Sequence, residues 1–281
     1  MKKTVLSIVS AIGLSAVLVG CGGNDSSTDT RAVSVSGSTS VTEVMEVLGE
    51  TWQQEHTGAV VEVQGTGSSS GIKAANDGTS EIGMTSRKLK PEEEKVGITQ
   101  AVLAHDGIAV VVNSKNPVTG LTTEQIADIF KGEITNWKAL GGNDQPIVVV
   151  TRDPASGTRG AFEDIMNLKF KDANGNVISA VSNRAQVASG NGVVKTTVAQ
   201  NSSAIGYISL GTVDGSLKAL EVNGVEASND TIATGEYTVA RPFVLLYNEQ
   251  TLTENGKAFL DWALSGEGQA IVAQQGYIPV I

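Results

Sequence analysis

The stretch PIVVVTRDPASGTRGAFEDIM, residues 146–166, joins a short apolar run to an amphipathic one through a loop of small polar residues. Residues 146–151 form a continuous apolar run rich in valine, which is typical of a buried strand. From 161 to 166 the apolar side chains recur at helical spacing, which predicts a helix. The stretch therefore predicts a strand–loop–helix unit whose helix opens with three small or hydroxyl-bearing residues: Ser156, Gly157 and Thr158.

This alternation of strand and helix patterns continues in both directions along the chain. Strand-like apolar runs lie at 32–38, 59–64, 81–86, 98–113, 203–210 and 239–248, the fourth of them interpreted as paired strands. Helical patterns lie at 40–55, 72–77, 121–137 (with a Thr cap and Glu124 close behind), 191–200 and in the C-terminal tail, whereas 167–185 is polar and irregular. Strands that alternate with helices predict an α/β fold with mainly parallel strands.

The N-terminus carries the pattern of a secretory signal. Lys2 and Lys3 precede an apolar segment at 4–19 that is too short for a spanning helix and lacks a stop-transfer flank. The segment ends LVGC at Cys21, which resembles the bacterial lipobox, although an ordinary signal peptide with an incidental cysteine is the alternative. We expect removal of residues 1–20, lipidation of Cys21, and a polar tether over 21–31 that holds the body on the outer face of a membrane.

The charge and the rarity of reactive side chains exclude several function classes. The formal net charge of −10 becomes −12 when Lys2 and Lys3 leave with the signal, so the chain lacks the basic surface that nucleic acids demand. Cys21 is the only cysteine, so no disulfide can form within the chain. Cysteine and histidine are too scarce for a metal cluster, and we expect neither a metal nor a cofactor.

Three predicted strands run into glycine- and hydroxyl-rich loops that open helices: SGSTS at 36–40, GTGSSSG at 65–71 and SGT at 156–158. One such loop is ordinary helix capping, but three at the carboxyl ends of strands predict a shared crevice. Helix N-termini present unpaired N–H groups and a partial positive charge, and Arg152 or Arg159 adds a planar fork for a tetrahedral oxyanion. The pattern therefore favours a small desolvated anion held by directed donors.

Two enzyme motifs come close to a match in the second loop. Residues 67–71 fit G-x-S-x-G, with Ser69 at the position of a hydrolase nucleophile. The triad also needs a histidine later in the chain, but His56 precedes the loop and His105 lies inside an apolar strand pattern. Residues 65–71 also contain one residue too many for a dinucleotide fingerprint. A serine hydrolase stays an alternative, and we expect no enzyme activity.

The chain resembles the substrate-binding lipoproteins of ABC-type phosphate transporters over essentially its whole mature length. The resemblance is carried by SGSTSV, GTGSSSGIKA, EIGMTSRKL, ITNWKALGG, RDPASGTRGAF, SAIGYISL, ARPFVLLYN and the final GYIPV, in that order. It implies the two-lobed periplasmic binding protein fold of type II, with the ligand cleft between the lobes. It also implies a first lobe from 32–112 plus 241–281 and a second from 113–240.

The resemblance further implies how phosphate is bound. Thr39 and Ser40, with Ser38 adjacent, belong to the first loop, and Ser68 to the second. In the second lobe, Arg152 makes the charged contact while hydroxyl and backbone donors come from Ser156, Gly157 and Thr158. Closure of the lobes around the ligand would then offer a docking surface to the membrane permease.

One position departs from the family pattern. In the best-known members, the strand that corresponds to EIGMTS ends in an Asp that accepts the proton of bound phosphate, whereas this chain has Ser86. A protonated phosphate oxygen needs an acceptor, since a buried unmatched donor costs about 1–3 kcal/mol. Asp106, in LAHDGIAV, is our candidate replacement, and a turn Asp that caps local backbone is the alternative.

We therefore expect a monomeric, lipid-anchored receptor that captures inorganic phosphate outside the cytoplasm and delivers it to permease subunits. Sulfate, molybdate or tungstate are alternative ligands, which calorimetry with each anion would separate. A surface adhesin or signalling component is a third class, and its partner binding would be indifferent to Arg152→Ala.

Overall fold

The computed structural model describes residues 32–281. The predicted signal sequence, Cys21 and the tether lie outside the described residues. Within the described part, no helix combines the length and apolar character needed to cross a bilayer. The helices are α1 (Thr39–Glu55), α2 (Ser68–Asp77), α3 (Thr123–Lys131), α4 (Gly157–Ile165), α5 (Asn191–Gln200), α6 (Asn229–Ala233), α7 (Glu254–Ala263) and α8 (Gly266–Gln274). The strands are β1 (Val33–Gly37), β2 (Val61–Gly65), β3 (Ile82–Thr85), β4 (Thr99–Asn113), β5 (Gly120–Leu121), β6 (Val148–Arg152), β7 (Lys169–Lys171), β8 (Val177–Ser179), β9 (Gln186–Ala188), β10 (Ala204–Ser209), β11 (Leu217–Ala219), β12 (Glu221–Val222) and β13 (Ala240–Tyr247).

A nine-stranded mixed sheet, in the order β2-β1-β3-β13-β4-β10-β6-β9 with β11 beside β4, runs through the described chain. β1 is parallel to β2 and β3, and β6 is parallel to β10 and β9. The central strands β13 and β4 are antiparallel to each other and to β3 and β10. The prediction of mainly parallel strands is therefore wrong for the centre of the sheet. A buried strand is apolar on both faces in either direction, so its pattern does not reveal its polarity.

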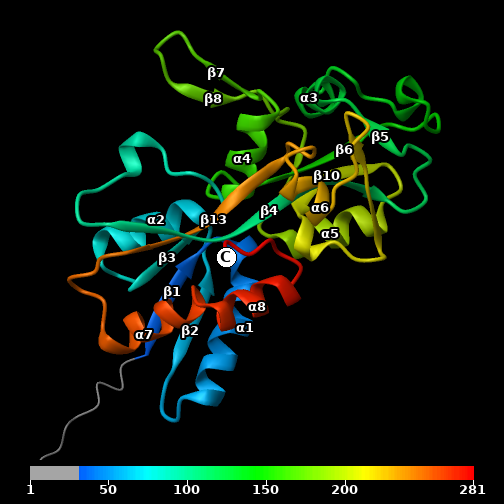
Figure 1. Cartoon of the computed structure of the whole chain (residues 1–281). Coiled ribbons are helices and arrows are strands. Elements are labelled where there is room, and N and C mark those ends of the chain that lie inside the picture. The colour runs from blue at the N-terminus through cyan, green and yellow to red at the C-terminus, as the bar shows by residue number, and fades with distance from the viewer. Residues whose placement is uncertain (1–31) are drawn as a thin grey trace, which may run out of the picture.

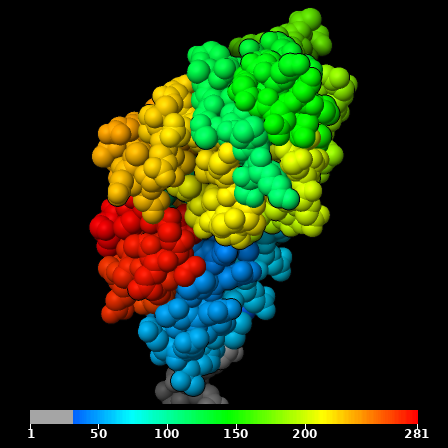
Figure 2. Space-filling view, turned by 90° about the vertical axis from the view of Figure 1, so that its right-hand side faces the viewer, coloured from blue at the N-terminus to red at the C-terminus, as the bar shows by residue number. Residues whose placement is uncertain are grey.

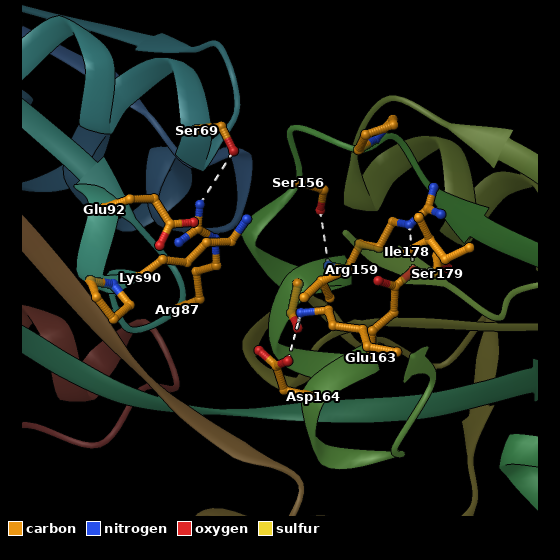
Figure 3. Close-up of a pocket in the computed structure, with 15 residues that line it drawn as sticks. Ser69, Arg87, Lys90, Glu92, Ser156, Arg159, Glu163, Asp164, Ile178 and Ser179 are labelled. Atoms are coloured by element: carbon orange, nitrogen blue, oxygen red, sulfur yellow. Dashed lines mark hydrogen bonds and ion pairs between the residues drawn. The ribbon is translucent and has the colours of Figure 1, made fainter. Parts of the chain in front are cut away.

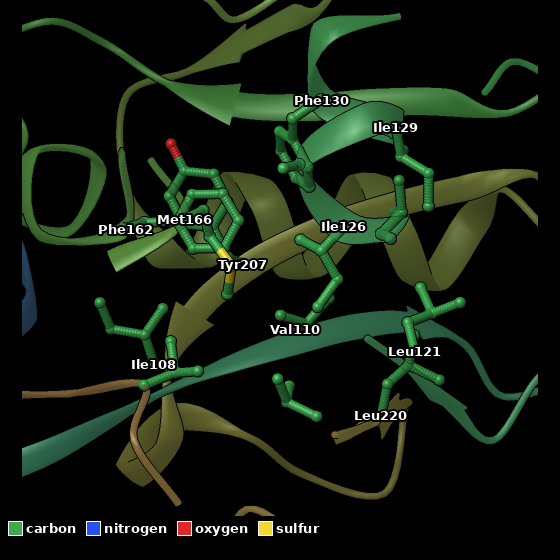
Figure 4. Packing of buried hydrophobic residues seen from close by; sticks show 14 of the residues in the cluster. Ile108, Val110, Leu121, Ile126, Ile129, Phe130, Phe162, Met166, Tyr207 and Leu220 are labelled. Atoms are coloured by element: carbon green, nitrogen blue, oxygen red, sulfur yellow. The ribbon is translucent and has the colours of Figure 1, made fainter. Parts of the chain in front are cut away.

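The apolar core is divided between the two ends of this sheet. One cluster, which includes Val35, Leu48 and Phe259, packs β1 and β3 against α1, α7 and α8, and we call this part the first half. A larger cluster around Phe130 and Tyr207 packs α3 and α4 against β4 and β10, and we call this part the second half (Figure 4). Figure 2 shows the two halves one above the other, with blue and red residues below and green to orange residues above.

The strands β4 and β13 connect the two halves (Figure 1). Leu103 and Ala104 of β4 belong to the first core, whereas Ile108 and Val110 belong to the second. The interpretation of 98–113 as paired strands is wrong, because β4 is one strand of 15 residues. The Asp-Gly step within it does not turn the chain, since Asp106 and Gly107 pair with Arg241 and Ala240 of β13. The lobe boundaries given above stay a prediction.

Local sequence accounts for the start of α3. α3 begins after Thr122, whose hydroxyl accepts from the backbone N–H of Gln125 at 3.2 Å while the Gln125 side chain accepts from the backbone N–H of Thr122. Gln125 rather than Glu124 completes this capping box, because it occupies the third helical position. The polar segment 167–185 contains a short hairpin of β7 and β8, which the sequence analysis missed.

Candidate functional site

The first predicted loop joins β1 to α1 at the end of the sheet. Gly37 has φ +142°, and a Cβ there would lie 2.1 Å from the carbonyl oxygen of Met84, so only glycine allows β1 to approach β3 this closely. Ser38 then caps α1, because its Oγ accepts from the backbone N–H of Ser40 at 3.2 Å. This turn places Thr39 and Ser40 in the first turn of α1.

The second predicted loop joins β2 to α2 and lies against the first. Gly67 precedes α2 with φ 93°, and the helix opens with Ser68, whose side chain is fully buried. A Cβ on Gly71 would lie 2.5 Å from Gly37 Cα, so the absence of a side chain lets α2 pack directly on the end of β1. Ser68 Oγ accepts from the backbone N–H of Ser86 at 3.1 Å, which ties α2 to the end of β3.

The third predicted loop brings α4, from the second half, onto these two loops. Ser156 caps α4, and its Oγ accepts from the backbone N–H of Arg159 at 3.2 Å, so the hydroxyl is used within its own helix. A Cβ on Gly157 would lie 2.1 Å from Ser68 Oγ and 2.7 Å from Ser86 Oγ. Glycine at this position therefore allows the N-terminus of α4 to contact the serines of the first half.

The three loops and the end of β3 share one group of largely buried side chains, which we call the hydroxyl cluster: Ser38, Thr39, Ser40, Ser68, Ser86 and Thr158. Ser38 Oγ lies 2.8 Å from Ser86 Oγ, and Ser68 Oγ lies 3.4 Å from the same atom. Ser40 Oγ lies 2.8 Å from Thr158 Oγ1 across the boundary between the halves. Apart from Thr39, each member is at most 2% exposed. The predicted convergence of the loops is confirmed, while a ligand-binding role for these residues stays a prediction.

Arg152, at the end of β6, reaches the cluster and is 1% exposed. Burial lowers the pKa of its guanidinium, and the nearby Tyr207 and Asp153 oppose that shift. Among residues 32–281, no carboxylate oxygen lies within 4.0 Å of the Arg152 guanidinium nitrogens, so Arg152 forms no ion pair there. Its acceptors are neutral: Thr39 Oγ1 at 2.8 Å, Asn191 Oδ1 at 3.0 Å, and the carbonyl oxygens of Ala188 and Ser189 at 3.3 Å. Arg152 is thus a buried cation that forms no ion pair with residues 32–281.

Asn191 and Arg241 also contact the cluster, and the sequence analysis missed both. Asn191 opens α5, and its Nδ2 donates to Ser40 Oγ at 3.1 Å. The signal for it was ASGNG at 188–192, a fourth glycine- and serine-rich loop between a strand and a helix. Arg241 lies in β13 and donates to Thr158 Oγ1 at 2.7 Å. Its signal was a lone charge in the apolar run 239–248.

The hydrogen bonds of the cluster have a defined direction. Guanidinium, amide and backbone N–H groups can only donate, so the hydroxyl that meets one must accept. Five cluster oxygens accept in this way: Ser38 from the Ser40 backbone, Thr39 from Arg152, Ser40 from Asn191, Ser68 from the Ser86 backbone and Thr158 from Arg241. The hydrogens of these hydroxyls remain for another hydroxyl or for an anion. The site is chemically a set of oriented donors beside an uncompensated positive charge.

Asp106 does not join this cluster directly. Its Oδ2 accepts from Arg241 Nη2 at 2.9 Å, and both side chains are almost fully buried. Burial raises the pKa of Asp106, and the charge and hydrogen bonds of Arg241 oppose that shift. Arg241 stands between Asp106 and Thr158, so the role of Asp106 as an acceptor for a phosphate proton stays a prediction.

A groove of about 430 Å³ lies beside the cluster, between the halves. Figure 3 shows Ser69, Arg87, Lys90 and Glu92 on one wall and Ser156, Arg159, Glu163 and Asp164 on the other. Ser69 Oγ accepts from Arg87 Nη2 at 3.3 Å. His56 instead contacts Trp52, and His105 pairs its backbone with Ile278, so neither histidine is positioned to activate Ser69. The geometry gives the hydrolase alternative no support.

The comparisons with known proteins agree with this geometry. Residues 24–267 match the family model of the PBP superfamily domain. The phosphate-binding protein PstS of Bacillus subtilis is 32% identical over 256 residues, which cover 89% of this chain and 81% of the relative. The chain belongs to the PBP superfamily and, within it, to the PstS family. The PstS of Borreliella burgdorferi is 28% identical and covers 100% of this chain and 99% of the relative.

Solved structures of this family share the fold. A phosphate ABC transporter substrate-binding protein from Clostridium perfringens, solved with bound phosphate, superposes with a TM-score of 0.84 at 47% identity, covering 89% of this chain and 100% of that one. An ABC-type phosphate transport receptor from Vibrio cholerae has a TM-score of 0.74 at 42% identity, covering 88% and 99%. The predicted α/β fold of periplasmic binding proteins is therefore confirmed.

Proposed function

We propose that this protein binds inorganic phosphate outside the cytoplasm and delivers it to the permease of an ABC importer, without catalysing a reaction. The observation that carries the proposal is Arg152, a buried cation with neutral partners, surrounded by hydroxyls from both halves. A buried charge without an ion pair carries a desolvation cost, so an anion that pairs with Arg152 would offset that cost. The membership of the PstS family supports phosphate as that anion.

The arrangement also supports binding coupled to closure. Ser38, Ser68 and Ser86 belong to the first half, whereas Arg152 and Thr158 belong to the second. An anion that bonds to both groups favours the state in which the halves are together, because only that state makes all contacts. The lobes predicted at 32–112 plus 241–281 and at 113–240 would then move about β4 and β13.

The experiment is a calorimetric titration of the purified protein with phosphate, sulfate, molybdate and tungstate in separate runs. We expect saturable heat with phosphate and a higher melting temperature in its presence, since a ligand that binds only the folded state stabilises it. Saturable heat with sulfate but none with phosphate would refute the proposal.

The membrane attachment belongs to the same proposal. Cys21 would carry the lipid, and the polar segment that follows it would let a monomeric body reach the permease. Cys21→Ser should move the protein from the membrane fraction to the soluble extracytoplasmic fraction while its phosphate affinity stays unchanged. Retention of this variant in membranes would contradict the lipid anchor and leave the binding proposal standing.

A further inference from the structure

The buried ion pair between Asp106 and Arg241 lies where the two halves join. The two residues face each other directly in the ladder between β4 and β13. On one side of this point the two strands pack in the first core, and on the other side β4 packs in the second. The side chains of Arg241 and Asp106 are 2% and 1% exposed, and Arg241 Nη2 and Nε lie 2.9 and 3.3 Å from Asp106 Oδ2.

The remaining nitrogen of Arg241 contacts both halves of the molecule. Arg241 Nη1 donates to the carbonyl oxygen of Ser86 at 3.2 Å and to Thr158 Oγ1 at 2.7 Å. Ser86 follows β3 of the first half, and Thr158 lies in α4 of the second half. One guanidinium nitrogen therefore bridges the two halves at the edge of the hydroxyl cluster.

This bridge decides which way the Thr158 hydroxyl points. A guanidinium has no acceptor, so Thr158 Oγ1 must accept from Arg241. The Thr158 hydrogen is then directed away from Arg241, toward Ser40 Oγ at 2.8 Å or an anion in its place. Without Arg241, the hydroxyl could rotate and would have to be ordered again on binding, which weakens the complex.

Asp106 fixes the orientation of Arg241. Its Oδ2 binds two of the three guanidinium nitrogens, which leaves Nη1 alone to face Thr158 and Ser86. Phe243 lies under the guanidinium, with its ring centre 5.4 Å from the central carbon, and limits movement on that side. An anion in the cluster would thus meet the cationic side of the pair, with the carboxylate behind it.

We propose that Arg241, oriented by Asp106, is a positioning residue of the anion site, which fixes Thr158 as a donor and links the two halves. The proposal rests on the proposed function and assigns Asp106 a role through Arg241 rather than contact with the ligand. It accounts for a buried ion pair at the junction of the halves that forms no part of either core.

The test compares phosphate dissociation constants for the wild-type protein, Arg241→Gln, Asp106→Asn and the double variant. Each single variant leaves a buried charge unpaired and can fold poorly, whereas the double variant leaves none. We expect the double variant to fold and to bind phosphate about 10- to 100-fold more weakly, the loss that accompanies one charge-assisted hydrogen bond. The exposed pair Lys138→Gln with Asp144→Asn is the control and should keep the wild-type affinity.

A second set separates positioning from structural support. If Arg241 acts through Thr158, the losses from the two changes should not add. The triple variant, which adds Thr158→Val to the double variant, should then bind phosphate about as tightly as Thr158→Val alone. A double variant with wild-type affinity would overturn the proposal, and so would fully additive losses with Thr158→Val. The proposal would also be overturned if Asp106→Asn gained sulfate binding while Arg241→Gln kept the wild-type phosphate affinity. That pair of results would show that Asp106 contacts the ligand directly. Wild-type protein that binds no phosphate would refute the proposed function itself.

Discussion

Replacing Arg152 with methionine is the sharpest test of the site, because stability and binding should change in opposite directions. Arg152 is 1% exposed and has four neutral acceptors but no carboxylate partner among residues 32–281. An unpaired buried charge carries a desolvation cost that neutral hydrogen bonds offset only in part. Methionine occupies much of the same space without the charge, so the ligand-free variant should unfold at the same or a higher temperature than wild type.

The loss of affinity follows from the same contacts. Four of the five guanidinium N–H groups have protein acceptors, so one remains for an anion. A second becomes available if an anion replaces Thr39 Oγ1 as the acceptor of Arg152 Nη2. Two charge-assisted hydrogen bonds of about 1.5–3 kcal/mol each correspond to a dissociation constant roughly 10²- to 10⁴-fold higher.

The assay is thermal unfolding with and without phosphate, together with calorimetric titration. Arg184→Met serves as the control, since Arg184 is exposed and its loss changes the net charge equally. The control should keep both the phosphate affinity and the thermal shift. An Arg152→Met protein that is markedly less stable without ligand, yet binds phosphate as well as wild type, would mean that Arg152 is structural and that the reasoning is wrong.

The remaining predictions concern closure, selectivity and acid stability. Gly157→Ala places a methyl group 2.1 Å from Ser68 Oγ, which overpacks the contact between the halves by about 1–3 kcal/mol. The phosphate dissociation constant should therefore rise about 10- to 100-fold in a calorimetric titration. Gly266→Ala is the control, because its Cβ would meet open space, and it should leave the dissociation constant unchanged. Ser86→Asp puts a carboxylate into the cluster, which should raise the preference for phosphate over sulfate about tenfold or more in competition titrations, and an unchanged ratio would contradict that placement. Burial acts to raise the pKa of Glu93, but hydrogen bonds from Arg87 and the Lys90 backbone outweigh it and hold that pKa below the usual 4.5. The ionised Glu93 therefore adds stability, which is complete above the pKa of Glu93 in the unfolded chain and is lost as the pH falls through its pKa in the folded protein. Denaturant unfolding between about pH 6 and about pH 3 should show a larger decrease in the free energy of unfolding for wild type than for Glu93→Gln.

The loops of the site could be predicted because their chemistry is local. A strand that ends in glycine and opens a helix with Ser or Thr uses those residues for capping and close approach, as Gly37 and Ser38 do. Parallel strands bring such ends to one edge of a sheet, which holds for β1 and β2. β6 is antiparallel to them through the pairings of β3, β13, β4 and β10, so its loop meets theirs from the opposite side. Ser156 shows the limit of this reasoning, because its hydroxyl caps its own helix instead of facing the cluster.

What could not be predicted depends on contacts between distant parts of the chain. β4 looked like two strands because its Asp-Gly step is typical of a turn, and only the pairing of Asp106 and Gly107 with β13 shows that one strand continues through this step. The partner of Asp106 is 135 residues away, so no local pattern could indicate that this carboxylate is neutralised. Asn191 was missed for a different reason: it belongs to a fourth loop of the recognised kind, preceded by a strand of three residues too short to stand out.

The buried arginines explain how an acidic protein can hold an anion. Arg87 is paired with Glu93 and Arg241 with Asp106, so each of these cations is neutralised by a carboxylate of the chain. Arg152 alone among these three has only neutral partners. Salt largely screens the interaction between exposed charges more than about 10 Å apart, whereas it screens a buried charge and its direct contacts much less. The formal net charge of −10 is therefore no obstacle, because at the proposed site an anion would contact one unpaired cation and a set of oriented hydroxyls rather than the surface of the molecule.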